Sequence, residues 1–252
     1  MPETLPSQYD DFAWFYHKYW GSGPNVFAVR IWPVMEERFL PLVRAGGRIL
    51  DLCCGSGRLA QELTGHGYHV TGVDGSAALL EIAREVAPQA KFIHADARTV
   101  RLPPSFDGAL SLYDSLNHVM EAGELAAAFR QVRAALRNGG PFLFDLNMDE
   151  GYRSRWRSTF GISADDHAMI ARPSYDPSTK VGTMALTMFR LRQDRWMRTD
   201  LTLYQRCYTE EEVEQALRDA GFVGIAAWDA VTDLGLQNES GRLFFFARAT
   251  SA

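Results

Sequence analysis

The chain has 252 residues, of which 46% are hydrophobic and 23% are charged, and its formal net charge is -5 at pH 7. These values predict one globular protein that buries roughly 70–75% of its unfolded surface, and the acidic balance argues against a protein that coats duplex nucleic acid. No window approaches the ~20 apolar residues of a membrane span, and the acidic start lacks a secretory pattern, so we expect a cytoplasmic protein.

From Arg48 onward, short β-rich runs alternate with helical patterns, which predicts an α/β fold with a doubly wound parallel sheet. Strands are expected in RILDLC (48–53), YHVTGVD (68–74), AKFIHAD (90–96), FDGALSLY (106–113) and PFLFDLN (141–147). Apolar residues at helical spacing predict helices over 76–87 and 123–136. Gly139 or Gly140 is expected to follow the second helix in a left-handed conformation.

The segment from Met148 to Cys207 has a different pattern. Its runs HAMIARPSY (167–175), VGTMALTMFRLR (181–192) and WMRTDLTLYQRCY (196–208) predict a three-stranded antiparallel meander with turns at 176–180 and 193–195. A helix then begins with Thr209 as its cap and Glu212 in the capping-box position. Strands over 223–231 and 241–249 are expected to close the chain.

Acidic residues and glycines follow the predicted strands, at the edge where open sheets of this kind bind ligands. Gly55, Gly57 and Ala60 form a G-x-G-x-x-A pattern, which suits nicotinamide and adenosyl cofactors equally. Asp74 lies nineteen residues after Gly55, the spacing at which a carboxylate accepts hydrogen bonds from both ribose hydroxyls. Asp96 favours an adenosyl cofactor, because an acid after the third strand can accept from an adenine amino group.

On these motifs the chain resembles the class I S-adenosylmethionine-dependent methyltransferases, in the branch that methylates small molecules such as sugar amines. ILDLCCGSGRLA resembles their glycine motif, VTGVDGS their ribose-binding acid, HADA their adenine loop and FDGALSLYDSLNHV their fourth motif. The resemblance implies a Rossmann-like, seven-stranded sheet with an antiparallel last strand, and S-adenosyl-L-methionine as cofactor. The cofactor contacts that it implies are Tyr16, Trp20, Asp51, Cys53, Gly55, Gly57, Asp74, Gly75, Leu79, Asp96, Ala97 and Tyr113.

The same resemblance divides the chain into three parts. Residues 1–46 are expected to form a helical lid in which Tyr9, Phe12, Tyr16 and Trp20 close over the cofactor, since a sulfonium cation favours aromatic faces. Residues 47–147 and 208–252 are expected to form the cofactor-binding domain. Residues 148–207 are expected to form an inserted antiparallel β cap over the carboxyl ends of the parallel strands, which serves either as a substrate cap or as the platform of a homodimer.

The insert holds nine arginines and one lysine against seven acids, a local excess of +3 in an acidic chain. Arg153, Arg172 and Arg206 are the first candidates for contacts to the acceptor, because inward-facing arginines would suit a carboxylate- or phosphate-bearing molecule. The alternative is that these arginines are the solvated face of a sheet.

Methyl transfer from a sulfonium is an in-line displacement, so a small-molecule amine needs mainly alignment and exclusion of water. His118 is the candidate base, and Tyr113, Asp114 and Asn117 are candidates to orient the acceptor. The alternative for His118 is a histidine that caps or packs the following helix. No N-P-P-Y or D-P-P-Y signature follows the fourth strand, which disfavours nucleic-acid substrates, and the cysteines lack the C-x-x-C spacing of a metal site.

Three other functions stay open on the sequence. A nicotinamide-dependent oxidoreductase is disfavoured by Asp51, Asp96 and the terminal strand pair. A catalytically silent protein that binds S-adenosylmethionine as a regulator would carry the same binding motifs. Methyl transfer to another protein would need an open groove instead of an enclosed cavity.

Overall fold

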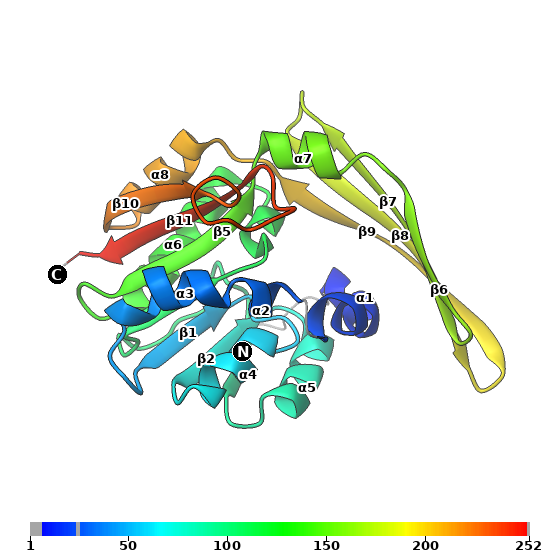
Figure 1. The fold of residues 1–252 in the computed structure, drawn as a ribbon, viewed down its shortest axis with the longest axis horizontal. Coiled ribbons are helices and arrows are strands. Elements are labelled where there is room, and N and C mark those ends of the chain that lie inside the picture. The colour runs from blue at the N-terminus through cyan, green and yellow to red at the C-terminus, as the bar shows by residue number, and fades with distance from the viewer. Residues whose placement is uncertain (1–6, 24–25, 251–252) are drawn as a thin grey trace.

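The computed structural model describes residues 7–23 and 26–250 (Figure 1). Residues 1–6 and 24–25, which belong to the expected lid, and residues 251–252 lie outside the described residues. In the part of the chain that is described, no helix has the length and apolar character needed to cross a membrane.

The body of the molecule is a seven-stranded sheet with the order β10-β11-β5-β4-β1-β2-β3. Its strands are β1 Arg48–Leu52, β2 His69–Asp74, β3 Lys91–His94, β4 Gly108–Ser111, β5 Pro141–Asn147, β10 Phe222–Asp229 and β11 Arg242–Ala249. Neighbouring strands run parallel except at β11, which is antiparallel to both β5 and β10. The predicted doubly wound sheet with an antiparallel last strand is therefore confirmed. Its order reverses between β1 and β4, which makes their carboxyl ends the expected ligand site.

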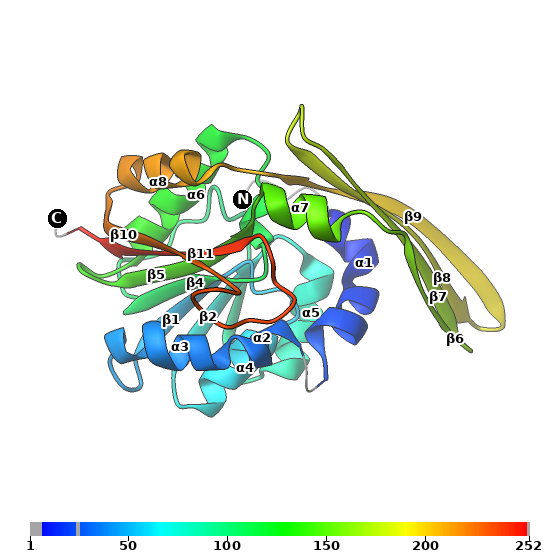
Figure 2. The same ribbon diagram turned by 45° about the horizontal axis from the view of Figure 1, so that its top comes forward.

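Helices cover both faces of this sheet (Figure 2). Leu50 and Leu52 of β1 pack with α6 and α8 on one face, and Ile49 packs with α2, α3 and α4 on the other. Alternate side chains of a strand point to opposite faces, so strands buried on both sides have nearly continuous apolar sequences. The helices are α2 Phe27–Arg30, α3 Trp32–Arg38, α4 Arg58–Gly65, α5 Ala77–Val86, α6 Ala122–Ala135 and α8 Glu210–Asp219, with short 3-10 turns at η2 Leu40–Leu42 and η3 Ser115–His118.

Two predicted helix boundaries agree with the structure. The side chain of Thr209 accepts from the backbone N–H of Glu212, whose carboxylate accepts from the N–H of Thr209, so the capping box of α8 is present. Gly139, which follows α6, has a φ of 76° and so adopts the expected left-handed conformation.

Between β5 and α8 the chain forms a second, antiparallel sheet with the order β6-β7-β8-β9, which extends from the body as an arm (Figure 1). Helix α7 (Asp149–Arg155) precedes its strands β6 Phe160–Ala164, β7 His167–Asp176, β8 Val181–Arg192 and β9 Arg195–Arg206. The predicted meander matches β7 to β9 and their turns, but the prediction of only three strands was wrong. β6 has five residues and includes Gly161 and Ser163, which gives a weak strand pattern.

Helix α1 (Gln8–Tyr16) and the π-helical turn η1 (His17–Gly21) lie between the body and the arm (Figures 1 and 2). Phe12 and Phe15 of α1 are buried in a third core with inward-facing residues of the arm, namely Met169, Ala171, Leu186, Met188 and Leu203. On the other side, the Asp10 carboxylate accepts from the Ser76 hydroxyl at 2.7 Å. The arm and α1 therefore pack as one layer over the edge of the sheet where α5 begins.

The glycine before β11 generates a stability prediction. Gly241 has a φ of +70°, and a Cβ there would lie 2.0 Å from the backbone nitrogen of Gly151 in α7. Gly235, in the same loop, has a φ of +67° but open space around its Cβ position. Gly235→Ala should therefore lower the Tm by roughly 2–8 °C through backbone strain alone. Gly241→Ala should lower it by roughly double that or more, because α7 must also shift. Equal Tm losses in thermal unfolding would contradict this close packing of α7.

Candidate active site

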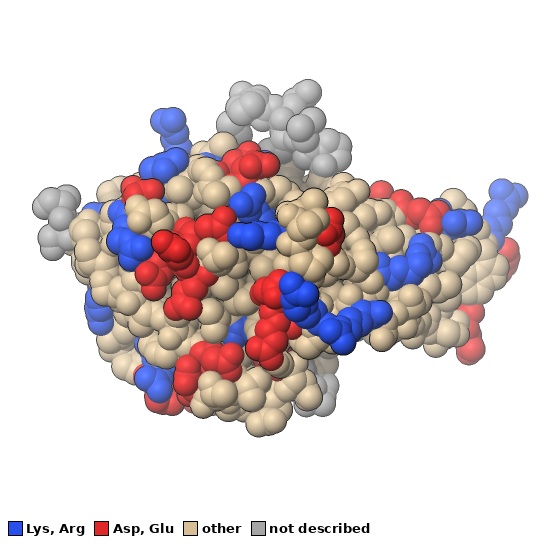
Figure 3. All heavy atoms as spheres, turned by 90° about the horizontal axis from the view of Figure 1, so that it is seen from above, with Lys and Arg blue, Asp and Glu red and all other residues tan. Residues whose placement is uncertain are grey.

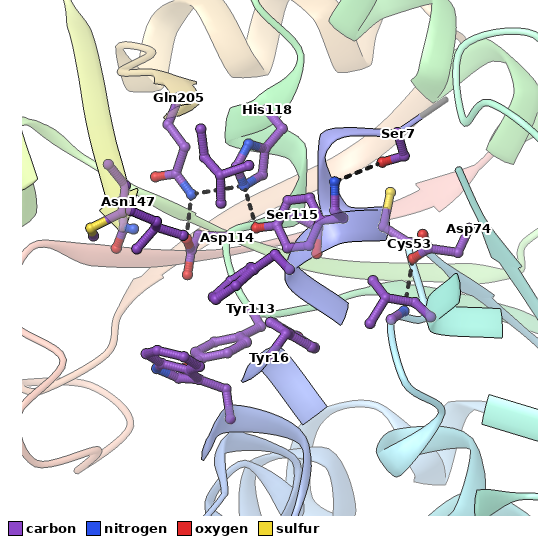
Figure 4. A pocket seen from close by; sticks show the side chains of 18 of the residues that line it. Ser7, Tyr16, Cys53, Asp74, Tyr113, Asp114, Ser115, His118, Asn147 and Gln205 are labelled. Carbon is purple, nitrogen blue, oxygen red and sulfur yellow. Dashed lines mark hydrogen bonds between the residues drawn. The ribbon is translucent and has the colours of Figure 1, made fainter. Parts of the chain in front are cut away.

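A cavity of about 400 Å³ lies at the carboxyl ends of the parallel strands, between them, α1 and the arm (Figure 4). The body contributes the glycine loop, the turn after β4 and the start of β11. The arm contributes Met184 and Leu186 of β8, and Leu203 and Gln205 of β9. The predicted cofactor loop and the insert therefore line the same cavity.

The glycine loop and Asp74 form the first wall of this cavity. The two carboxylate oxygens of Asp74 accept from the backbone N–H groups of Gly55 and Ser76, each at 2.8 Å. Burial raises the pKa of Asp74, and these two N–H groups oppose the shift. Gly55 has a φ of +53°, and a Cβ there would lie 3.3 Å from the Tyr16 ring. A side chain at this position would be both strained and crowded against the lid.

Asp51 lies in a smaller cavity of about 50 Å³ that shares Tyr16, Trp20, Cys53 and Tyr113 with the first. Its side chain is 2% exposed, and its Oδ2 has no hydrogen-bond partner among the described residues. Burial, with a smaller contribution from Asp74, raises the pKa of Asp51 to about 8. An unpaired buried carboxylate is costly, so this oxygen is suited to a donor that arrives with a ligand.

The turn after β4 is strained. Tyr113 and Asp114 have φ values of 69° and 48°, a left-handed conformation that non-glycine residues adopt at a cost of about 1–3 kcal/mol each. Both backbone N–H groups donate to the carboxylate of Asp145, at 2.6 and 2.9 Å. Asp145 on β5 thus holds the turn in place. As a result, the Tyr113 ring stacks on Phe27 with centroids 4.9 Å apart, and Asp114 lines the cavity.

Arg242 supports the same turn from β11. Its guanidinium is 2% exposed and pairs with Asp145, with Asp114 at 2.8 Å and with Glu239 at 2.8 Å. Burial raises the pKa of Asp145 to about 6, although Arg242 opposes the shift. Arg155 of α7 also pairs with Glu239, at 3.1 Å, as does Arg30 of α2, so the three carboxylates meet cations from three elements.

His118 lies in the cavity wall with both ring nitrogens engaged. Nδ1 is 2.8 Å from the carbonyl oxygen of Tyr204, which can only accept, so Nδ1 carries the proton of the neutral ring. Nε2 then accepts from the Tyr9 hydroxyl at 2.9 Å and from the Gln205 amide at 3.2 Å. Burial lowers the pKa of His118, and Asp114 opposes the shift. The site therefore holds a neutral imidazole whose lone pair faces the cavity.

Aromatic rings of α1 and η1 form the lid side of the cavity. The ring centroids of Tyr9 and Tyr16 lie 5.8 Å apart, and those of Phe12 and Trp20 lie 5.6 Å apart. Burial raises the pKa of both tyrosines well above the ordinary range, so their phenols stay neutral. Together they present uncharged aromatic faces opposite the glycine loop.

The structure brings together most of the residues expected to contact the cofactor. The larger cavity is lined by Tyr16, Trp20, Cys53, Gly55, Asp74, Gly75, Leu79 and Tyr113, and the smaller one also by Asp51. Gly57, Asp96 and Ala97 line neither cavity. A Cβ on Gly57 would lie 2.9 Å from the Ala83 side chain, so this glycine permits α4 and α5 to approach closely. Asp96 is paired with Arg98 at 2.5 Å.

The three arginines expected to face an acceptor lie away from the cavity. Arg153 pairs with Asp149 at 2.5 Å, Arg172 donates to Thr187 at 2.8 Å, and Arg206 pairs with Glu212 at 3.2 Å. On the face drawn in Figure 3, basic side chains on the arm are interspersed with acidic ones. None of the three lines the cavity. Arg153 and Arg172 are exposed, as the solvated-face alternative expects, whereas Arg206 is half-buried against Glu212.

Several residues of the cavity or its support were not expected from the sequence, namely Asp145, Arg155, Gln205, Glu239 and Arg242. A signal for one of them was present. Asp145 interrupts the apolar run PFLFDLN of a central strand, and a buried charge requires a partner of opposite sign. Nothing in the local sequence says that Arg242 is this partner.

Comparisons with known proteins agree with this geometry. Residues 49–140 match the family model of a methyltransferase domain. The putative methyltransferase YqeM of Bacillus subtilis (strain 168) is 29% identical to this chain over 223 residues. The match covers 86% of this chain and 89% of that protein.

Two solved structures share the fold. An S-adenosylmethionine-dependent methyltransferase from Clostridium acetobutylicum superposes with a TM-score of 0.77 at 20% identity, covering 97% of this chain and 100% of that one. The sugar N-methyltransferase KedS8 from Streptoalloteichus superposes with a TM-score of 0.75 at 19% identity, covering 100% of this chain and 96% of that one. At these identities the likeness shows the class I fold.

The charge cluster generates the second prediction. Arg242→Met should cost about 3–5 kcal/mol, because the buried carboxylates of Asp145 and Glu239 and the half-buried one of Asp114 lose their shared cation, and should lower the Tm by roughly 6–20 °C. Arg248→Met, on the same strand but away from the cluster, should change stability by less than about 1 kcal/mol. Thermal unfolding of both variants measures the difference, and an Arg242→Met protein as stable as Arg248→Met would contradict the role given to this cluster.

Proposed function

The chain is an S-adenosylmethionine-dependent methyltransferase of the class I fold, and we propose that it methylates a small-molecule amine held in the cavity beneath the arm. The observation that carries this proposal is that one cavity is lined by Gly55 and Asp74 of the body, by the α1 aromatics and by β8 and β9 of the arm. A cavity of this size, covered on one side by the arm, can hold a small acceptor, and the bound acceptor would help keep water from the reacting methyl group.

The residues present fit the cofactor. Each Asp74 oxygen keeps a lone pair that can accept from a ribose hydroxyl besides its bond to a backbone N–H. The unpartnered Oδ2 of Asp51 would accept from the cofactor's ammonium group, and the nearby positive charge would favour the ionised form of this carboxyl. Gly55 leaves the loop open beside Tyr16, where a Cβ would be crowded. Of the contacts expected from the sequence, we propose those that line the two cavities as the cofactor contacts.

S-adenosylmethionine supplies a methyl group on a positively charged sulfur, which the lone pair of an amine displaces in line. The protein's part is to present that lone pair. We propose that the neutral Nε2 of His118 takes the proton of an acceptor ammonium after the Tyr9 hydroxyl and the Gln205 amide release its lone pair. Asp114 would hold the ammonium by charge, and Tyr113 would orient the acceptor.

We also propose the arm, residues 148–207, as the acceptor cap. Its inner face supplies apolar Met184, Leu186 and Leu203 to the cavity wall, and α7 supplies Arg155. With Asn147 and Glu239 this wall combines apolar and polar groups, which suits an acceptor that carries hydroxyl groups on a compact ring. The likeness to KedS8, which is a sugar N-methyltransferase, supports an amino sugar.

The function is tested by incubating the protein with S-adenosylmethionine and a panel of amino sugars, simple amines and phenols, with mass spectrometry to find the methylated product. Titration calorimetry compares binding of S-adenosylmethionine with binding of NAD⁺. Binding of NAD⁺ alone would favour the oxidoreductase alternative. Binding of S-adenosylmethionine without turnover on any acceptor would support a silent regulator, and methylation of phenols alone would overturn the amine assignment.

Asp74→Ala should weaken binding of S-adenosylmethionine about tenfold to a hundredfold, since losing a charged hydrogen-bond acceptor costs on the order of 1.5–3 kcal/mol. Titration calorimetry measures the affinity, and circular dichroism confirms that the variant is folded. Asp74→Asn keeps the size of the side chain and isolates the effect of charge. An unchanged dissociation constant in Asp74→Ala would remove the ribose-binding role.

His118→Ala should lower the methylation rate roughly a hundredfold and leave cofactor affinity unchanged. In the wild type, the rate should fall with decreasing pH as His118 becomes protonated. Because burial lowers the pKa of His118, this fall should lie below the ordinary range of histidine. A near-normal rate in His118→Ala, measured by product formation, would contradict the role of His118 as base and favour a packing role.

A further inference from the structure

Gln205 on β9 connects the arm to the reacting side of the cavity. Its side chain is buried, and Oε1 accepts from the Tyr152 hydroxyl at 2.9 Å. Its Nε2 donates one proton to Asp114 at 2.7 Å and directs the other to Nε2 of His118 at 3.2 Å (Figure 4). The amide thus has a partner for each of its polar atoms, and its orientation is determined by three side chains from two different elements.

These contacts act on the protonation of His118. A protonated Nε2 has no lone pair and cannot accept from Gln205, so the contact favours the neutral ring. Gln205 also occupies Oδ2 of Asp114, the carboxylate that would otherwise attract an imidazolium most directly. Both effects lower the tendency of His118 to take a proton before the acceptor arrives.

We propose that Gln205 is a positioning residue for methyl transfer, which bridges Asp114 and His118 so that the ring of His118 stays neutral until the acceptor arrives. The inference rests on the proposed role of His118 as the base. By this inference the arm does more than cover the cavity, because its residue Gln205 also controls the protonation of His118.

The charged and titratable groups around His118 determine whether a substitution at position 205 raises or lowers its pKa. Tyr9 faces the ring from α1 as a neutral phenol, and Asp114 faces it from the turn after β4 as an anion. Arg242 from β11 neutralises Asp114 from the other side. Placing a carboxylate at position 205 adds an anion beside the ring. Gln205→Glu should therefore raise the pKa of His118.

The direct experiment is an NMR titration of the imidazole ring signals, with the His118 signal assigned by its loss in His118→Ala. Relative to wild type, the midpoint in Gln205→Glu should rise by about one pH unit, the low end of the effect of an adjacent opposite charge. Gln205→Leu, which removes the donor without adding charge, should raise it by a smaller amount. Gln205→Leu also serves if the added buried carboxylate prevents folding of Gln205→Glu.

The pH dependence of kcat gives a second readout. The acid limb in the Gln205 variants should move up with the NMR midpoint. At the pH of the wild-type midpoint kcat should fall about fivefold in Gln205→Glu and less in Gln205→Leu, and it should approach wild type at alkaline pH. KM for S-adenosylmethionine should not change. Thr202→Val, on the same strand with its side chain on the opposite face, is the matched control and should leave both readouts unchanged.

Two outcomes would overturn the inference. One is an unchanged His118 midpoint in a folded Gln205 variant, and the other is a loss of kcat that is equal at every pH, as a merely structural role predicts. If wild type methylates no acceptor, the proposed function fails, but the NMR midpoint still decides whether Gln205 keeps His118 neutral. The two failures are therefore distinguishable.

Discussion

The candidate active site depends on one buried ion cluster. Arg242 joins the carboxylates of Asp145 and Asp114, and Asp145 in turn holds two consecutive residues in a left-handed conformation that they would not adopt freely. Buried ion pairs often contribute little net stability, so their value here is in geometry. The cluster directs Tyr113 and Asp114 into the cavity at the point where the strand order reverses.

Contacts from this turn reach the arm and the lid. Asp114 accepts from Gln205 of β9, and His118 accepts from Tyr9 of α1, so each element that encloses the cavity is bonded to the same short segment of the body. The apolar core of Phe12 and Phe15 with the inner face of the arm adds packing to these hydrogen bonds. The cavity is therefore built by three parts of the chain that are distant in sequence, and the placement of each depends on the others.

Local patterns in the sequence were enough to predict the sheet, the glycine loop and Asp74, because strand periodicity and the spacing of a βαβ unit are local properties. They were not enough for Gln205, Glu239 and Arg242, whose roles arise only from tertiary contacts. Arg153 shows the opposite error. Its charge suggested a contact to the acceptor. Because it lies four residues after Asp149 on α7, it instead forms a surface ion pair with that residue.

The central claim is that cofactor and acceptor share the cavity between the glycine loop and the arm. A crystal structure with S-adenosylhomocysteine and an amino sugar tests it most directly. The account predicts ribose hydroxyls on Asp74, and the sulfur and the acceptor nitrogen both on the side of the cavity formed by His118, Asp114 and Gln205. A cofactor whose sulfur faces open solvent, or an acceptor bound outside the arm, would contradict it.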